Sequence, residues 1–228
     1  MKQTSHVFHT VIPRSSTFQY LISLPLNYEK GDQDTWPVLL YLHGAGERGN
    51  DINTLLGNGL PALIEAGNDF PFITISPLCP VDTWWSDHLG VLDILLKEVC
   101  DRYRADIHRI AATGVSMGGY GVWHAGVIFP ERFSCLVPIG GGGAWFYGFP
   151  RVARKLINTP VWAFHGENDP IIPLRESSVL VRELTSAGGH AQLTVLPGAG
   201  HEIWQDVYSN PEVVKWMLAQ SKLTSSEP

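Results

Sequence analysis

The sequence predicts an α/β fold, a three-layer α/β/α sandwich in which a mostly parallel sheet lies between two layers of helices. Two observations support this prediction. Short apolar runs alternate along the chain with longer amphipathic segments, as in folds built from strand–helix–strand units. Most of the short runs are apolar at consecutive positions, which is typical of parallel strands covered on both faces. Because no linker interrupts the pattern, we expect residues 1–228 to form one domain.

Seven segments have the composition of strands. Phe18–Leu24 is expected near an edge of the sheet. The segments that follow it are short and rich in apolar and β-branched residues. They are Val38–His43, Phe72–Ser76, Arg109–Thr113, Ser134–Ile139, Val161–His165 and Gln192–Leu196.

Four segments have the pattern of helices. Leu89–Arg104 carries an apolar stripe with its charged residues off that stripe. Met117–Phe129 is apolar and glycine-rich, and Pro130 ends it. Leu174–Ala187 is followed by two glycines, which commonly end a helix. Pro211–Ser221 has its proline in the first turn, where proline is tolerated.

The composition argues against several classes of function. Lys and Arg total 16 against 22 Asp and Glu, a formal net charge of −6 without any basic run, so nucleic-acid binding is not expected. No apolar run reaches the roughly 18 residues of a membrane span, and the N-terminal segment lacks an apolar signal sequence. We therefore expect a cytoplasmic protein without membrane contact. Three widely spaced cysteines, Cys79, Cys100 and Cys135, favour buried free thiols over disulfides or a zinc site.

The most informative motif is Gly114-Val115-Ser116-Met117-Gly118-Gly119, which follows an apolar strand and precedes a helix. In a G-x-S-x-G turn the small residues allow a tight, strained backbone without clashes. Such a turn lifts the serine hydroxyl above the sheet and points the N-terminus of the next helix at the reacting centre. Ser116 is therefore the candidate nucleophile. The alternative is a glycine-rich turn with a passive serine.

A serine hydroxyl needs a base, and the base needs an acid to orient it. His201 lies in the glycine-rich loop PGAGHEIW after the last strand and is the candidate base. Asp169 follows a strand in HGENDPIIP and is the candidate acid, with Glu167 and Asp206 as competitors. His165 is too close in sequence to Asp169 to be chosen as the base.

Backbone N–H groups are expected to stabilise the oxyanion of the reaction. Met117, the residue after the nucleophile, should supply one donor. The second should come from the loop after Val38–His43, where small residues let the backbone approach a substrate closely. Ala45 is the expected donor, with Gly46 as the alternative. His43 is expected to orient this loop rather than to act as a base.

These segments resemble a known family. The matching stretches are LYLHGAGERGND, PLCPVDTWW, GVSMGGYG, FHGENDPIIP and GAGHEIWQDVYSNPEVVKWML. They are similar to α/β-hydrolase esterases of the predicted peptidase or phospholipase/carboxylesterase group, akin to feruloyl esterases, polyhydroxybutyrate depolymerases and dienelactone hydrolases. The resemblance spans roughly residues 36–220 and implies the α/β-hydrolase fold and carboxylic-ester hydrolysis. It also implies Ser116, Asp169 and His201 as the triad, in the chain order of that fold, and Ala45 and Met117 as oxyanion donors.

Other chemistries have little support. The segment HEIWQ lacks the second histidine of the zincin motif, no cluster of metal ligands is visible, and neither a metal nor a cofactor is expected. Two aromatic groups follow strands, Trp84-Trp85 and the segment with Trp145. Trp85 and Trp145 are predicted to line the substrate pocket, the alternative being core or subunit contacts. The short segment Gly140–Pro150 predicts an open pocket.

Together these features predict a serine carboxylesterase that hydrolyses small or aryl carboxylic esters through an acyl-enzyme. Its expected partner is a small-molecule ester. Two alternatives remain open at this point. The same triad attacks amides and thioesters, so a peptidase- or thioesterase-type acyl hydrolase is possible, as is a non-catalytic binding protein with the hydrolase fold.

Overall fold

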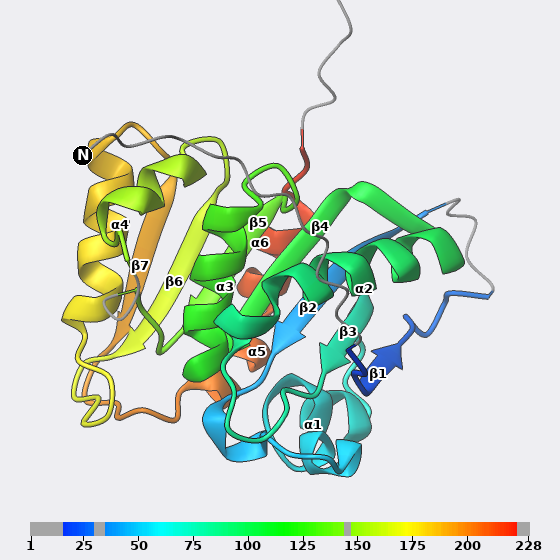
Figure 1. Ribbon diagram of the computed structural model, residues 1–228. Helices are drawn as coiled ribbons and strands as arrows, with labels where there is room; N and C mark the ends of the chain where they lie inside the picture. The colour runs from blue at the N-terminus through cyan, green and yellow to red at the C-terminus, as the bar shows by residue number, and fades with distance from the viewer. Residues whose placement is uncertain (1–15, 30–34, 144–146, 223–228) are drawn as a thin grey trace, which may run out of the picture.

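The computed structural model describes residues 16–29, 35–143 and 147–222. Its strands are β1 (Tyr20–Ser23), β2 (Trp36–Leu42), β3 (Ile73–Pro77), β4 (Ala105–Val115), β5 (Cys135–Ile139), β6 (Val161–Gly166) and β7 (Ala191–Leu196). They form one sheet in the order β1-β3-β2-β4-β5-β6-β7 (Figure 1). Strands β2 to β7 pair in parallel, and β1 pairs antiparallel with β3 at one edge. The predicted mostly parallel sheet and its edge strand are confirmed.

The two faces of the sheet are covered by different helices. The helices are α1 (Gly59–Glu65), α2 (Leu89–Arg102), α3 (Met117–Ile128), α4 (Arg175–Ser186), α5 (Trp204–Ser209) and α6 (Pro211–Leu218). Residues of α2, α3 and α4 belong to one buried apolar cluster, and residues of α1, α5 and α6 belong to the other. Figure 1 shows α2, α3 and α4 in front of the sheet and α5 and α6 behind it. The predicted three-layer sandwich is confirmed.

Strand β2 shows why consecutive apolar residues predicted buried strands. Successive side chains of a strand point to opposite faces. Val38, Leu40 and Leu42 accordingly pack with the α2–α4 layer, whereas Leu39 and Tyr41 pack with the α1, α5 and α6 layer. All five side chains are at most 1% exposed. A strand with helices on both sides therefore has no polar face.

Some element bounds differ from the prediction. Strand β4 begins at Ala105, four residues before the predicted start, because Ala105 pairs with Trp36 at the beginning of β2. Helix α6 ends at Leu218 rather than at Ser221. Helices α1 and α5 were not predicted, since seven and six residues are too few to show a helical period.

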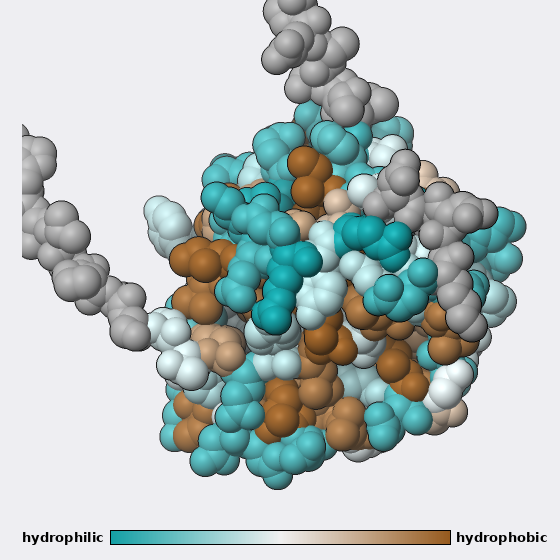
Figure 2. All heavy atoms as spheres, turned by 90° about the vertical axis from the view of Figure 1, so that its right-hand side faces the viewer, coloured by the Kyte–Doolittle hydropathy of each residue, from teal (hydrophilic) through white to brown (hydrophobic). Residues whose placement is uncertain are grey.

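The surface at the β1 edge is of mixed character. Figure 2 shows this side of the molecule, with apolar side chains in small groups between polar ones. Scattered apolar side chains are ordinary on a folded protein. In the part of the chain that the structure describes, no helix combines the length and the apolar character needed to cross a membrane.

Candidate active site

Ser116 lies at the sharp turn between β4 and α3. Its φ of +54° and ψ of −115° place it in a region that L-amino acids rarely adopt. Such a conformation costs about 1–3 kcal/mol and persists only where the surroundings impose it. Here the Ser116 amide donates to the carbonyl of Ile139 at 2.9 Å, and the Ser116 carbonyl accepts from the amide of Tyr120 at 3.2 Å. The end of β5 and the first turn of α3 thus hold the turn in place.

The turn requires glycine because it packs backbone against backbone. A Cβ added to Gly118 would lie 1.8 Å from the carbonyl oxygen of Leu42, and one on Gly114 would lie 2.6 Å from the carbonyl oxygen of Gly118. Neither neighbour is a side chain that could move aside. The glycines of the motif therefore let α3 start directly beside β2, which brings the loop after β2 next to Ser116.

We expect Gly118→Ala to destabilise the fold by about 3 kcal/mol, near the upper end of overpacking effects, because backbone must shift. Urea unfolding followed by circular dichroism measures this change. Gly90→Ala is the matched control, since a Cβ on Gly90 in the first turn of α2 meets nothing within 4 Å. That control should be neutral or slightly stabilising. Equal stability of Gly118→Ala and the wild type would contradict the packing argument.

The three residues predicted as a triad form one hydrogen-bonded chain. His201 Nε2 lies 2.9 Å from Ser116 Oγ, and His201 Nδ1 lies 2.7 Å from Asp169 Oδ2. An ionised carboxylate can only accept, so Nδ1 carries the hydrogen and Nε2 offers its lone pair to the hydroxyl. These residues follow the carboxyl ends of β4, β6 and β7, which lie at the same end of the parallel strands. The structure therefore brings Ser116, Asp169 and His201 together.

The Asp169 carboxylate is held in a fixed orientation. Its Oδ1 accepts the amides of Ile171 and Ile172, both at 2.9 Å, and its side chain is fully buried. Burial by itself raises the pKa of this carboxyl, but the hydrogen bonds from His201, Ile172 and Ile171 outweigh burial and lower the pKa below its ordinary value. Asp169 is thus poised as an anion beside His201.

The two competing carboxylates lie elsewhere. Glu167 is exposed, and its Oε2 accepts the amide of Gly198 at 2.7 Å. Asp206 is exposed in the first turn of α5. Among the hydrogen bonds of the described residues, neither carboxylate is bonded to His201.

The predicted oxyanion donors flank Ser116. Met117 is the first residue of α3, and Ala45 follows Gly44 in the loop of residues 43–49, here called the β2 loop. A Cβ added to Gly44 would lie 3.7 Å from the Ser116 Cβ, so this loop runs beside the nucleophile. Within the described ranges, the amides of Ala45 and Met117 donate to no protein acceptor. Both are therefore available to a bound oxygen.

The buried side chains of His43 and Trp85 hold the backbone of the β2 loop in place by hydrogen bonds. The Nδ1–H of His43 donates to the Gly44 carbonyl at 2.6 Å, and Nε2 accepts the Cys79 amide at 2.9 Å. Burial lowers the pKa of His43, which keeps its ring neutral in this role. The Trp85 indole donates to the His43 carbonyl at 3.0 Å.

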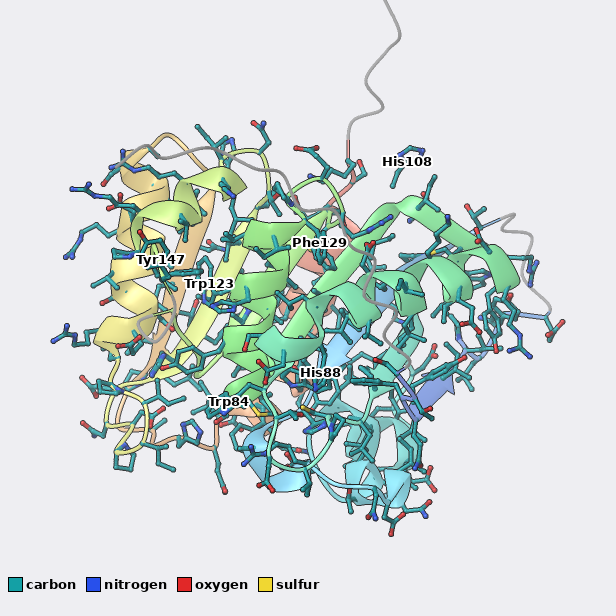
Figure 3. The ribbon with its side chains drawn as sticks, in the orientation of Figure 1. Trp84, His88, His108, Trp123, Phe129 and Tyr147 are labelled. Atoms are coloured by element: carbon teal, nitrogen blue, oxygen red, sulfur yellow. The ribbon has the colours of Figure 1, made fainter. Side chains whose placement is uncertain are left out.

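The prediction that Trp85 lines the pocket is therefore corrected. Its side chain is 1% exposed and packs in the core below the β2 loop, because the indole serves as a hydrogen-bond donor to that loop. Trp145, the other predicted pocket residue, lies outside the described residues. The adjacent Trp84 is 47% exposed instead. Figure 3 shows Trp84 in the lower half of the view, near the end of the sheet toward which the parallel strands run, and His108 near the top.

Arg48 connects Trp84 to the β2 loop. Its guanidinium lies 5.8 Å from the centre of the Trp84 ring, and its Nε donates to the Ala45 carbonyl at 3.1 Å. A second bond runs from Arg48 to the carbonyl of Thr83 at 3.2 Å. Arg48 thus lies between the exposed indole and the loop residue whose amide is the candidate oxyanion donor.

Sequence reasoning missed a network that joins the β2 loop to the loop of His201. Asn58 donates to the Glu47 carboxylate at 2.5 Å and accepts the Trp204 indole N–H at 2.9 Å. The Trp204 ring meets the His201 ring edge to face at 5.8 Å. Asn58 and Trp204 are 146 residues apart, so no local pattern could have indicated their contact.

The described residues contain no group of three or more His, Cys, Asp or Glu side chains that could hold a metal ion. A serine, a histidine and a carboxylate in a hydrogen-bonded chain, with two free amides nearby, have the functional groups needed for acyl transfer.

The order of the sheet, the helices on both faces and the serine turn after the central strand define the α/β-hydrolase fold. Within that fold, the chain belongs to the phospholipase/carboxylesterase family, whose model matches residues 91–210. The match includes Ser116, Asp169 and His201.

Similar proteins include several ester hydrolases. A thermostable esterase of known structure is 28% identical with a TM-score of 0.76 over 90% of this chain. A poly(3-hydroxyoctanoate) depolymerase of Pseudomonas fluorescens is 24% identical over 209 residues, covering 81% of this chain and 74% of its own. A feruloyl esterase module from Clostridium thermocellum, solved as an S954A mutant with sinapinate, has a TM-score of 0.65 at 14% identity, covering 93% of this chain and 91% of its own.

The chain spans only part of some relatives. It covers 60% of the thermostable esterase. It covers 3% of a non-reducing polyketide synthase of Preussia isomera, to which it is 27% identical over 78 residues and 32% of its own length.

Proposed function

We propose that this protein is a serine carboxylesterase that hydrolyses small or aryl carboxylic esters through an acyl-enzyme intermediate. The observation that supports this most directly is the Ser116–His201–Asp169 chain, with contacts of 2.9 and 2.7 Å. Membership in the phospholipase/carboxylesterase family supports the same reaction class. We also propose that residues 1–228 act as one domain.

In the first half of the proposed reaction, Ser116 Oγ attacks the ester carbonyl carbon while His201 Nε2 takes the hydroxyl proton. The carbonyl oxygen becomes an oxyanion, which accepts hydrogen bonds from the amides of Ala45 and Met117. The intermediate then collapses, and His201 returns the proton to the departing alcohol. The acyl group stays on Ser116.

In the second half, water attacks the acyl-enzyme and His201 accepts its proton. The same two amides stabilise the second oxyanion, and collapse releases the carboxylic acid and the Ser116 hydroxyl. Asp169 remains ionised throughout, fixes the His201 tautomer and stabilises the imidazolium that forms. Its lowered pKa fits this role.

Two features support small or aryl substrates. Only about twenty residues separate β5 from β6, which leaves little chain for a deep cap over Ser116. The exposed indole of Trp84, held by Arg48 beside the β2 loop, offers a face on which an aromatic ring could stack. A feruloyl esterase module solved with sinapinate has a similar fold. We propose that Trp84 replaces Trp85 as the tryptophan that contacts substrate.

A panel of nitrophenyl esters tests the proposed specificity. We expect kcat/KM to be highest for aryl-acyl esters and for acyl chains of about two to six carbons. A longer chain would extend into water, and a CH₂ group contributes about 0.8 kcal/mol only when it is buried. Trp84→Ala should lower kcat/KM for the aryl ester by about 2- to 10-fold, since the ring contact is lost.

Ile94→Ala is the control, because Ile94 is also an exposed apolar residue but lies on α2. It should leave all esters unaffected. A peptide anilide and an acyl thioester in the same panel examine the other acyl-transfer reactions. A preference for long-chain fatty esters, or a Trp84→Ala variant with unchanged aryl-ester kinetics, would contradict the proposed open aromatic site.

A further inference from the structure

His165 is a fully buried histidine next to the candidate acid. It lies near the end of β6, four residues before Asp169. Its Nδ1 is 2.8 Å from Ser177 Oγ. Its Nε2 is 2.8 Å from the carbonyl oxygen of Ile172 and 3.3 Å from Asp169 Oδ2. Both ring nitrogens therefore have polar contacts, and the proposed reaction uses neither of them.

The hydrogens around Ser177 can be assigned from these contacts. A serine hydroxyl has one hydrogen, and Ser177 Oγ lies 2.7 Å from the carbonyl oxygen of Gly141, which can only accept. Ser177 therefore donates to Gly141 and presents a lone pair to His165. A hydrogen bond at that contact requires a hydrogen on Nδ1 of His165.

The contacts of the other ring nitrogen, Nε2, require a hydrogen there as well. The Ile172 carbonyl and the Asp169 carboxylate both accept hydrogen bonds, so Nε2 must also carry a hydrogen. A neutral ring with its hydrogen on Nδ1 would point the Nε2 lone pair at the Ile172 and Asp169 oxygens, which also carry lone pairs. A neutral ring with its hydrogen on Nε2 would need the Ser177 hydroxyl to donate to Nδ1 instead of to Gly141. The Gly141 carbonyl, in a buried residue, would then lose its donor, and an unsatisfied buried acceptor is costly.

We propose that His165 is doubly protonated in the folded protein and is a positioning residue for the triad. Its Nε2–H donates to the carbonyl of Ile172, whose amide donates to Asp169 Oδ1, and its positive charge lies 3.3 Å from Asp169 Oδ2. Its Nδ1–H, through Ser177, connects Asp169 to the backbone of Gly141 after β5. This inference rests on the proposed function, because it assigns His165 a part in orienting the acid of that reaction.

The hydrogen-bonded chain through His165 and Ser177 ends at Gly141, which packs close to the turn of Ser116. A Cβ on Gly141 would lie 2.5 Å from the carbonyl carbon of Gly119, so Gly141 packs directly on the first turn of α3 behind Ser116. A Cβ on the preceding Gly140 would lie 3.6 Å from His201 Cε1. The chain from Asp169 through His165, Ser177 and Gly141 thus fixes the acid relative to the turn of Ser116. His165 and His201 both contact Oδ2 of Asp169, at 3.3 and 2.7 Å.

Nitrogen-15 NMR of the histidine rings tests the proton assignment without reference to activity. Protein labelled at its nine histidines is measured at about pH 8, where an exposed histidine is neutral. His165 is assigned through its backbone in the wild type. We expect both of its ring nitrogens at the chemical shift of protonated nitrogen. An unprotonated Nδ1 or Nε2 in His165 would overturn the proposal.

Enzyme kinetics tests the positioning role. His165→Gln keeps a hydrogen-bond donor but loses the charge, and we expect kcat to fall by about 10- to 100-fold with KM little changed, as for a misplaced catalytic group. The acid limb of the pH profile of kcat/KM should move to higher pH. With its cation gone, Asp169 would favour protonated His201 more strongly.

Two comparisons complete the test. Ser177→Ala breaks the same chain and should lower kcat, whereas Ser178→Ala, one residue further on α4, should not. Unfolding by urea identifies any variant that does not fold. A folded His165→Gln protein with wild-type kcat and pH profile would overturn the positioning role. Labelling of Ser116 by a phosphonate separately reports whether the proposed serine mechanism holds.

Discussion

Ser116→Ala is expected to lower kcat for ester hydrolysis by about 10⁴-fold or more. The hydroxyl is the atom that forms the acyl-enzyme, and alanine leaves His201 without a proton donor at 2.9 Å. The free amides of Ala45 and Met117 would still bind an oxyanion, so a small residual rate should remain. Steady-state hydrolysis of a short nitrophenyl ester measures the loss.

Covalent labelling separates a lost nucleophile from a lost fold. A phosphonate or sulfonyl fluoride should label the wild type at Ser116 with one equivalent and should not label Ser116→Ala, as seen by mass spectrometry of peptides. Ser178→Ala serves as the control serine, because its hydroxyl bonds only to the carbonyl of Arg175 among the described residues. Near-wild-type turnover by Ser116→Ala would refute the serine mechanism.

Asp169→Asn is the second change with a large expected effect, a loss of about 10⁴-fold in kcat with the fold retained. The asparagine amide can donate to His201 Nδ1, which would place the ring hydrogen on Nε2, facing Ser116. The base would then be lost although the geometry is kept. Glu167→Gln and Asp206→Asn are matched controls and should stay near the wild type, since neither side chain is bonded to His201 among the described residues.

Stability against pH gives a second readout of Asp169. Its pKa is lower in the folded protein than in the unfolded chain, where an aspartate titrates near about 3.9. At a pH above the pKa of the unfolded chain, the ionised Asp169 therefore contributes its full stabilisation to the fold. This contribution disappears as the pH falls through the lower pKa of the folded protein. The difference in unfolding free energy between the wild type and Asp169→Asn should be constant near neutrality and shrink below about pH 4.

An acid assignment to Asp206 would be supported instead if Asp206→Asn proved the damaging change. A difference in unfolding free energy that stayed constant through acid pH would contradict the lowered pKa of Asp169.

The sequence was most informative where local pattern and tertiary environment agree. Strand β2 is apolar at every position because helices cover both of its faces, so its burial could be predicted directly. The positions of Ser116, Asp169 and His201 were predictable for a related reason. Each follows a parallel strand, and the carboxyl ends of parallel strands lie at one edge of the sheet.

Contacts between distant segments could not be predicted in the same way. Trp84 and Trp85 are adjacent in the chain, yet one is exposed and the other is buried under the β2 loop. Composition and spacing do not distinguish them, because the choice depends on which indole can reach the His43 carbonyl. The same holds for Asn58 and Trp204, which meet only after the loops after β2 and β7 come together.

The separation of the proposed triad along the chain has a consequence for how the protein matures. Ser116 and His201 are 85 residues apart, and β5, β6 and β7 with their crossover connections lie between them. Parallel strands joined by crossovers form slowly, because the chain loses the entropy of closing a long loop before the strand contacts stabilise it. During synthesis from the N-terminus, the serine turn emerges well before its histidine partner. The proposed hydrolytic activity would therefore appear only with the completed sheet, and it can serve as a reporter of complete folding.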